Sequence, residues 1–185
     1  MTRIDPLTPP YEPAVAAQLG RMMPPGIPPI GLFRTFARNL PMSTAMVDWG
    51  GYQLSKRLSL SMRQRELVIV RVTARCACEY EWGVHLAFFG DRVGFTDAQK
   101  RSLTHGVPED GCWPIAEAAL LAAVDELHDH ADLGDVAWSA LESVLTPEQI
   151  LDLLLLAGWY HAISYAANAA RVTLEAGAPR FVEFR

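Results

Sequence analysis

Cysteines, clusters of basic residues and long apolar runs are all scarce in this chain of 185 residues. Its three cysteines are too few, and odd in number, for a disulfide framework. Its formal net charge is −5, without the basic cluster that nucleic-acid binding requires. The longest uninterrupted apolar run, Leu153 to Tyr160, falls short of the roughly 20 residues of a membrane-spanning helix, and the N-terminus lacks the apolar segment of a secretory signal. We therefore expect a cytoplasmic protein that binds neither nucleic acid nor a membrane.

Proline is concentrated near the N-terminus, where eight of the thirteen prolines lie between Pro6 and Pro29. Residues 1–30 are therefore expected to form an arm with at most one short helix, roughly residues 11–23, ahead of a single domain over residues 31–185. The arm could be a surface tail. It could also lie across a neighbouring subunit, which would account for its apolar side chains and those that follow: Ile27, Ile30, Leu32 and Phe33.

Capping-box patterns, in which Ser or Thr is followed three residues later by Gln, mark three helix starts. They begin at Ser61, Thr96 and Thr146, and the third also has a proline at the first helical position. From these signals and from the spacing of apolar residues we expect helices over residues 34–39 (stopping at Pro41), 42–56 (with Gly50 and Gly51 as a weak point), 115–130, 135–145 and about 147–175.

The segment 66–72 is rich in β-branched residues and could be read as a strand from local propensity alone. It continues into Ala74 and beyond without a turn signal, and no partner strand is apparent nearby. We predict a helix there and an all-α fold for the chain.

The stretch from Cys78 to His85 gathers groups capable of chemistry. On one continuous helix Cys78, Glu81 and His85 would lie within roughly 60° of one another, with Glu81 and His85 in reach as an i, i+4 pair. A carboxylate beside an imidazole raises the pKa of the histidine, which suits a general acid or base. The imidazole or a helix N-terminus could also favour the Cys78 thiolate, whereas Cys76 should point elsewhere.

A Glu-x-x-x-His pair is common on solvated helix faces, and a small cysteine is usually a packing residue. The surroundings are what distinguish this segment, because the polar groups are interspersed with apolar ones, Trp82, Val84, Leu86, Phe88 and Phe89. Polar groups in such a setting need partners, and such partnered groups often form functional sites.

Three segments together resemble the core signature of the carboxymuconolactone decarboxylase family: Arg65 to Val72, Cys78-x-x-Glu81-x-x-x-His85, and Val93 to Asp97. The alkyl hydroperoxidase D branch of that family carries a Glu, then twelve residues later Cys-x-x-Cys followed by x-x-x-His, and Glu66 lies twelve residues before Cys78. The resemblance implies an AhpD-like helical bundle and a homo-oligomer (dimer, trimer or hexamer). It also implies a catalytic set of Glu66, Cys78, Glu81 and His85, with Glu66 as a proton-relay carboxylate.

The sequence departs from the peroxidase branch at one position. Glu81 stands where that branch has its peroxide-attacking cysteine, and Cys78 aligns with the resolving cysteine. A carboxylate cannot form the disulfide that a two-thiol cycle needs, and Cys76 is a poor substitute because i, i+2 side chains diverge on a helix.

The Glu-x-x-x-His spacing is similar to that of the decarboxylase branch, where loss of CO₂ leaves an enolate that must be protonated. His85 with Glu81 could supply that proton. Arg71 and Arg75 are candidates for holding a substrate carboxylate, and Trp82 and His161 are further substrate-binding candidates, although a structural role is the simpler reading of His161.

The predicted function is therefore acid–base chemistry on a small carboxylated or lactone-like substrate. Two alternatives stay open, a peroxidase-like protein that uses Cys78 alone and a non-catalytic binding or assembly subunit. We expect no cofactor and no metal, because His128 and His130 stand among acidic residues without a ligand spacing.

Overall fold

The computed structural model describes residues 1–185 and contains helices but no β-strand, as the sequence predicts. A single π-helical turn, η1 (Leu86–Gly90), follows the fifth helix, and a short 3₁₀ helix, η2 (Phe181–Phe184), lies near the C-terminus. The α-helices are α1 (Pro13–Met22), α2 (Gly31–Phe36), α3 (Leu40–Gln53), α4 (Met62–Arg75), α5 (Glu79–His85), α6 (Asp97–His105), α7 (Ile115–His130), α8 (Asp135–Glu142) and α9 (Pro147–Ala170).

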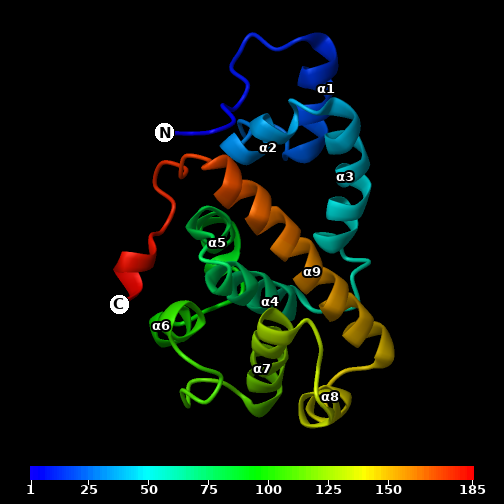
Figure 1. The fold of residues 1–185 in the computed structure, drawn as a ribbon, viewed down its shortest axis with the longest axis vertical. Coiled ribbons are helices and arrows are strands. Elements are labelled where there is room, and N and C mark those ends of the chain that lie inside the picture. Colours follow the sequence, from blue (N-terminus) through cyan, green and yellow to red (C-terminus); the bar gives the residue numbers. More distant parts are fainter.

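Helix α4 forms the centre of the protein, packed against α5, α6, α7 and α9 (Figure 1). All of its residues from Arg65 to Thr73 are buried. Each fully buried Val, Leu or Ile side chain stabilises the fold by roughly 1.5–3 kcal/mol, which outweighs the small helix penalty of β-branched residues. This burial explains why the run that resembles a strand forms a helix.

All three predicted capping boxes are present, with both reciprocal hydrogen bonds at Ser61, Thr96 and Thr146.

The prediction for Pro41 was wrong in one respect. A helix was expected to stop there, yet Pro41 lies in the first turn of α3, where its missing N–H leaves no hydrogen bond unmade, and the Asn39 side chain accepts from the Met42 N–H.

One helix was expected to carry Cys78, Glu81 and His85, but the chain is not helical between Arg75 and Glu79. Ala77 adopts a left-handed conformation (φ 49°), the Cys78 N–H donates to the Thr73 carbonyl at 2.8 Å, and the Ala77 N–H donates to the Ala74 carbonyl at 2.9 Å. This is a Schellman motif, which usually has glycine at the left-handed position. Because Ala77 is not a glycine, the sequence did not predict that the helix ends here. Cys78 is consequently the N-cap of α5 and not a residue on its face.

Helix α9 runs through most of the length of the molecule, with α3 on one side and α4 and α5 on the other (Figure 1). By length and composition alone α9 could cross a membrane, although no uninterrupted apolar run in it is that long. Half of its most apolar window is buried inside this protein, as in a core helix. Its outer side exposes Leu151, Leu155 and Tyr165.

The first 30 residues pack on their own chain. The Gln18 side-chain amide donates to the Ser43 carbonyl at 2.8 Å, and the Arg3 N–H donates to the Ala170 carbonyl at 2.8 Å. Ile30 and Leu32 are buried in a second core cluster, whereas Ile27 is exposed. The apolar side chains that suggested an exchanged arm are thus largely covered within one chain, and exchange between subunits stays a prediction.

Candidate active site

A chain of hydrogen bonds joins α4, α5 and α9 through the imidazole of His85. Its Nδ1 lies 2.7 Å from Glu66 Oε2, and because a carboxylate only accepts, the ring N–H donates to it. The Tyr160 hydroxyl lies 3.0 Å from His85 Nε2. Glu81 Oε1, one helical turn before His85, is 3.7 Å from the same nitrogen. All four residues are buried, so the groups interact out of contact with bulk water.

Arg65 supplies a cation that the sequence analysis did not assign. Its Nε donates to Glu66 Oε1 at 2.7 Å, and its Nη1 donates to the Leu54 carbonyl at 3.1 Å. Adjacent residues diverge by about 100° on a helix, so spacing along the sequence gave no signal for this contact. The guanidinium compensates the buried charge of Glu66 and so leaves the other carboxylate oxygen to orient His85.

The buried carboxyl of Glu81 and the imidazole of His85 both favour their protonated forms. Burial raises the pKa of Glu81, and the negative charge of Glu66 raises it further. Burial by itself lowers the pKa of His85, but the carboxylates of Glu66 and Glu81 outweigh this and raise the pKa above its ordinary value. Glu81 Oε1 lies 3.7 Å from His85 Nε2, and Glu81 Oε2 has no hydrogen-bond partner of its own.

The other member of the predicted set, Cys78, lies in a different environment. Its side chain is 0% exposed and packs in the second core cluster with Leu32, Tyr80 and Ile163. Burial raises the pKa of the Cys78 thiol to about 11. The expectation that a neighbouring imidazole or helix N-terminus would favour the thiolate is thus contradicted, because desolvation dominates at this position.

Arg71 and Arg75 are not brought to the site. Five and nine positions after Glu66, they lie about 140° and 180° around the helix from it, facing α7 instead of α5. Arg71 Nε and Nη2 form a bidentate pair with Asp125 at 2.6 Å each, and Arg75 Nη2 lies 2.5 Å from Asp129. Their assignment as substrate-binding residues at this site is therefore wrong.

Trp82 and His161 also face away from the imidazole of His85. The indole of Trp82 is fully buried against Phe181 and Phe184 of the C-terminal segment, with ring centroids 4.8 and 5.4 Å away. His161 Nε2 lies 2.9 Å from a different histidine, His128. Tyr160, which the sequence analysis missed, reaches the site, and the spacing of buried residues along α9 could have identified it as inward-facing.

Phe89, in the π-helical turn after His85, covers the imidazole. Its ring stacks on that of His85 with centroids 5.5 Å apart and planes inclined by 29°. The guanidinium carbons of Arg65 and Arg92 lie 5.0 and 5.3 Å from the Phe89 centroid. Phe89 is half-buried while its neighbour Phe88 is exposed, so Phe89 is the side chain between the imidazole and the surface. Single π-helical turns are frequent at functional sites.

The sequence matches a known family over the helices that carry this cluster. Residues 42–125 match the model of the carboxymuconolactone decarboxylase family, a range that includes Glu66, Cys78, Glu81 and His85. This match, together with the fold of solved structures, supports the AhpD-like, carboxymuconolactone decarboxylase superfamily for this chain. A comparison with curated protein sequences gives no match.

Three solved structures share this fold and cover between 76% and 97% of the chain. An uncharacterized peroxidase-related protein from Silicibacter sp. TM1040 has a TM-score of 0.82 at 16% identity, with 97% of this chain and 95% of that chain covered. The putative antioxidant defence protein AhpD from Agrobacterium tumefaciens gives a TM-score of 0.68 at 19% identity, covering 76% and 95%. The debrominase Bmp8 in complex with 2,3,4-tribromopyrrole gives 0.78 at 13% identity, covering 95% and 93%. At these identities the likeness concerns the fold.

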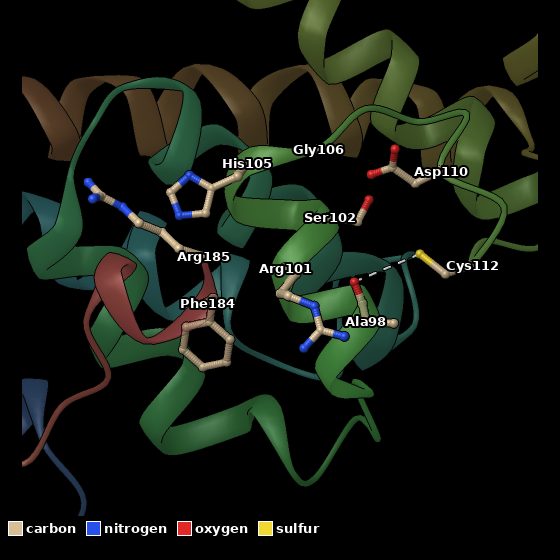
Figure 2. Close-up of a pocket in the computed structure, with 9 residues that line it drawn as sticks. All are labelled: Ala98, Arg101, Ser102, His105, Gly106, Asp110, Cys112, Phe184 and Arg185. Carbon is tan, nitrogen blue, oxygen red and sulfur yellow. Dashed lines mark hydrogen bonds between the residues drawn. The ribbon is translucent and has the colours of Figure 1, made fainter.

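A surface pocket of about 350 Å³ lies away from the His85 cluster (Figure 2). It is bordered by α6 and by the C-terminal residues Phe184 and Arg185, and Figure 2 shows Arg101 and His105 at its edge. A second pocket, of about 410 Å³, lies between α8 and α9. None of the predicted catalytic residues lines either pocket. The side chains of the His85 cluster are buried, and the half-buried Phe89 stacks on the imidazole.

Proposed function

We propose that this chain is an enzyme of the superfamily that uses Glu81 and His85 as acid and base on a small carboxylated or lactone-like compound. The observation that carries the proposal is the hydrogen-bonded chain from Glu66 through His85 to Tyr160, with Glu81 beside the same nitrogen. A carboxylate on Nδ1 fixes the ring orientation and stabilises the imidazolium, which is what a proton donor near neutral pH requires.

In such a decarboxylation the C–C bond to the carboxylate breaks, CO₂ leaves, and the electron pair stays on the substrate as an enolate. His85 Nε2–H or the Glu81 carboxyl then donates a proton to the carbon. The Tyr160 hydroxyl can donate a hydrogen bond to the developing negative charge, and burial raises the pKa of Tyr160 well above its ordinary value, so the hydroxyl keeps its proton. General acid–base assistance of this kind contributes about 10²–10⁴-fold to rate.

The burial of the site has a consequence for substrate entry. A small molecule reaches His85 Nε2 only if a covering side chain moves, and Phe89 is placed to do so because it is half-buried and lies on a π-helical turn. The substrate is therefore proposed to be small and at least partly apolar, in keeping with the aromatic cover and the buried surroundings.

Three observations oppose thiol peroxidase activity through Cys78. Its side chain is fully buried, and the raised pKa of the thiol leaves little thiolate at neutral pH. Glu81 also occupies the position of the second thiol of the peroxidase branch. The names of the peroxidase-related neighbours describe those proteins, whose identity to this chain is at most 19%.

The proposal is tested by following CO₂ release from a panel of small β-keto acids and carboxylated lactones. We expect turnover that is lost in Glu81→Gln and in His85→Ala but kept in Cys78→Ser. If turnover is lost in Cys78→Ser but kept in the other two variants, thiol chemistry is favoured. No turnover of any panel member, and no peroxide consumption, would favour a non-catalytic subunit.

We also propose that the chain forms a homo-oligomer through α9. Leu151, Leu155 and Tyr165 are exposed on its outer side, an apolar surface that a second copy could cover. Size-exclusion chromatography with light scattering measures the mass, and Leu155→Glu is expected to lower it to that of one chain, whereas an unchanged mass contradicts the proposed interface. A cytoplasmic location stays a prediction.

A further inference from the structure

Three potential metal ligands from distant parts of the sequence converge beside the end of α4. Cys76 is the residue that follows α4, His128 lies in the last turn of α7, and His161 lies on α9. Cys76 Sγ is 3.9 Å from His128 Nδ1, and His128 Nδ1 is 2.9 Å from His161 Nε2. The three ligand atoms all lie within 4.8 Å of one another, and each residue is only partly buried.

One of the imidazoles is already oriented for metal binding. His161 Nδ1 lies 2.9 Å from the Ala157 carbonyl oxygen, which can only accept, so this nitrogen carries the ring proton. Its Nε2 therefore presents a lone pair to the centre of the cluster. A hydrogen bond from the second ring nitrogen to a backbone carbonyl is the usual way in which proteins orient a metal-binding histidine.

The spacing of the ligand atoms fits a tetrahedral ion. Zinc–nitrogen bonds of about 2.0–2.1 Å and zinc–sulfur bonds of about 2.3 Å place two nitrogens about 3.4 Å apart, and a nitrogen and a sulfur about 3.6 Å apart. The observed 2.9 and 3.9 Å lie on either side of these values. A lengthening of about 0.5 Å in the nitrogen–nitrogen separation and a shortening of about 0.3 Å in the nitrogen–sulfur separation would bring them to those values.

We propose that Cys76 Sγ, His128 Nδ1 and His161 Nε2 bind one Zn²⁺ ion, with a water molecule as the fourth ligand. One thiolate and two imidazoles form a ligand set that zinc accepts readily, and the partial exposure of all three residues leaves a solvent-facing position for water. The proposal does not depend on acid–base chemistry at His85.

The charges around the cluster are compatible with a bound cation. Arg75, the nearest basic side chain in sequence to Cys76, pairs with Asp129 and Asp125, which compensate its charge. The Cys76 backbone is itself held in place, because the Asn168 side-chain amide donates to its carbonyl at 2.9 Å. An ion here would join α4, α7 and α9, and would brace the turn that positions the start of α5.

The alternative is a hydrogen bond between two neutral histidines with a cysteine nearby, and metal titration distinguishes the two. The full-length protein is treated with a chelator, dialysed, and titrated with Co²⁺ in the presence of a phosphine reductant. We expect one equivalent to bind, with a thiolate-to-cobalt band in the near ultraviolet and intense tetrahedral bands in the visible, all removed by added Zn²⁺.

Variants assign the ligands. Cys76→Ser should abolish the near-ultraviolet band, and His128→Gln and His161→Gln should each weaken Zn²⁺ binding at least about tenfold. Matched controls are Cys112→Ser, which removes another partly exposed thiol, and His130→Gln, two residues after His128; both should bind normally. Absence of a stoichiometric cobalt spectrum, or a band that survives Cys76→Ser, would overturn the proposal.

A measurement on the unmodified protein covers the case in which a variant misfolds. Alkylation by iodoacetamide, read out by peptide mass spectrometry, should be slowed by Zn²⁺ at Cys76 at least about tenfold, because a bound thiolate is a poorer nucleophile. Cys112 should react equally with and without the ion. Equal alkylation of Cys76 in both conditions would argue against the site as firmly as a missing cobalt spectrum.

Discussion

The carboxylate of Glu66 and the imidazole of His85 form a buried hydrogen bond of 2.7 Å between residues 19 positions apart. The bond joins α4 to α5 across the turn at residues 76–78. It fixes which nitrogen of His85 faces the carboxylate, and so turns Nε2 toward Tyr160 and Glu81. The geometry needed for proton transfer therefore depends on a contact that neither helix could form by itself.

Glu66→Gln should lower both the pKa of His85 and turnover. An amide does not stabilise the imidazolium, so burial, which lowers the pKa of His85, is then less opposed. We expect a fall in turnover of about 10²-fold, and NMR titration of the ring nitrogens measures the pKa. The exposed Glu109→Gln is the control. An unchanged pKa in Glu66→Gln would show that this carboxylate does not govern His85.

Phe89→Ala should expose the imidazole of His85. We expect faster acylation of His85 by diethyl pyrocarbonate, located by peptide mass spectrometry, and a loss of about 1–2 kcal/mol of stability because the half-buried ring and its cation–π contacts are removed. Phe88→Ala is a matched control, because its neighbouring ring is exposed and does not stack on His85. Equal acylation in the two variants would mean that Phe89 is not the cover.

The free energy of unfolding should fall as pH rises through the neutral range. The pKa of Glu81 and the pKa of His85 are both raised in the folded protein from ordinary values of 4.5 and 6.5. At these two groups the folded state therefore binds more protons than the unfolded state, whereas the lowered pKa of His128 acts in the opposite direction. The contribution of each group to the free energy of unfolding is fully present below its ordinary pKa and is lost as pH rises through its raised pKa.

Urea unfolding at constant ionic strength between about pH 5 and about pH 8 measures this slope. Glu81→Gln should flatten it, because one of the two titrating groups is removed, while the exposed Glu142→Gln should leave it unchanged. Stability that rises with pH over this interval would mean that the two groups do not hold their protons in the folded protein.

Mild peroxide should leave Cys78 unmodified in the native protein. The thiol is fully buried and its pKa is raised to about 11, so it presents neither surface nor thiolate to the oxidant. Cys76 and Cys112 are partly exposed and should oxidise first, as read by intact mass and peptide mapping. In denaturant all three should react. Preferential sulfenic acid at Cys78 in the native state would revive the thiol mechanism.

Sequence patterns predicted the elements of this fold whose stabilising contacts are local. The capping boxes at Ser61, Thr96 and Thr146 were found because each joins residues three positions apart. The break at Ala77 was missed because its left-handed conformation is held by hydrogen bonds of the α4 end, in a residue that carries no turn signal. The proximity of Glu81 to His85 was predictable, as the capping boxes were, because only one helical turn separates the two residues.

By itself, the sequence determined the all-α class, the three helix starts marked by capping boxes, and the residues Glu66, Glu81 and His85 as a group. Only the tertiary structure decided that Tyr160 and Phe89 complete this site, that Arg71 and Arg75 do not, and that Cys76 lies beside two histidines 52 and 85 positions later in the chain. The physical reason is the range of the contacts. Spacing along one helix fixes which side chains share a face, but the packing of α4, α7 and α9 fixes which faces meet.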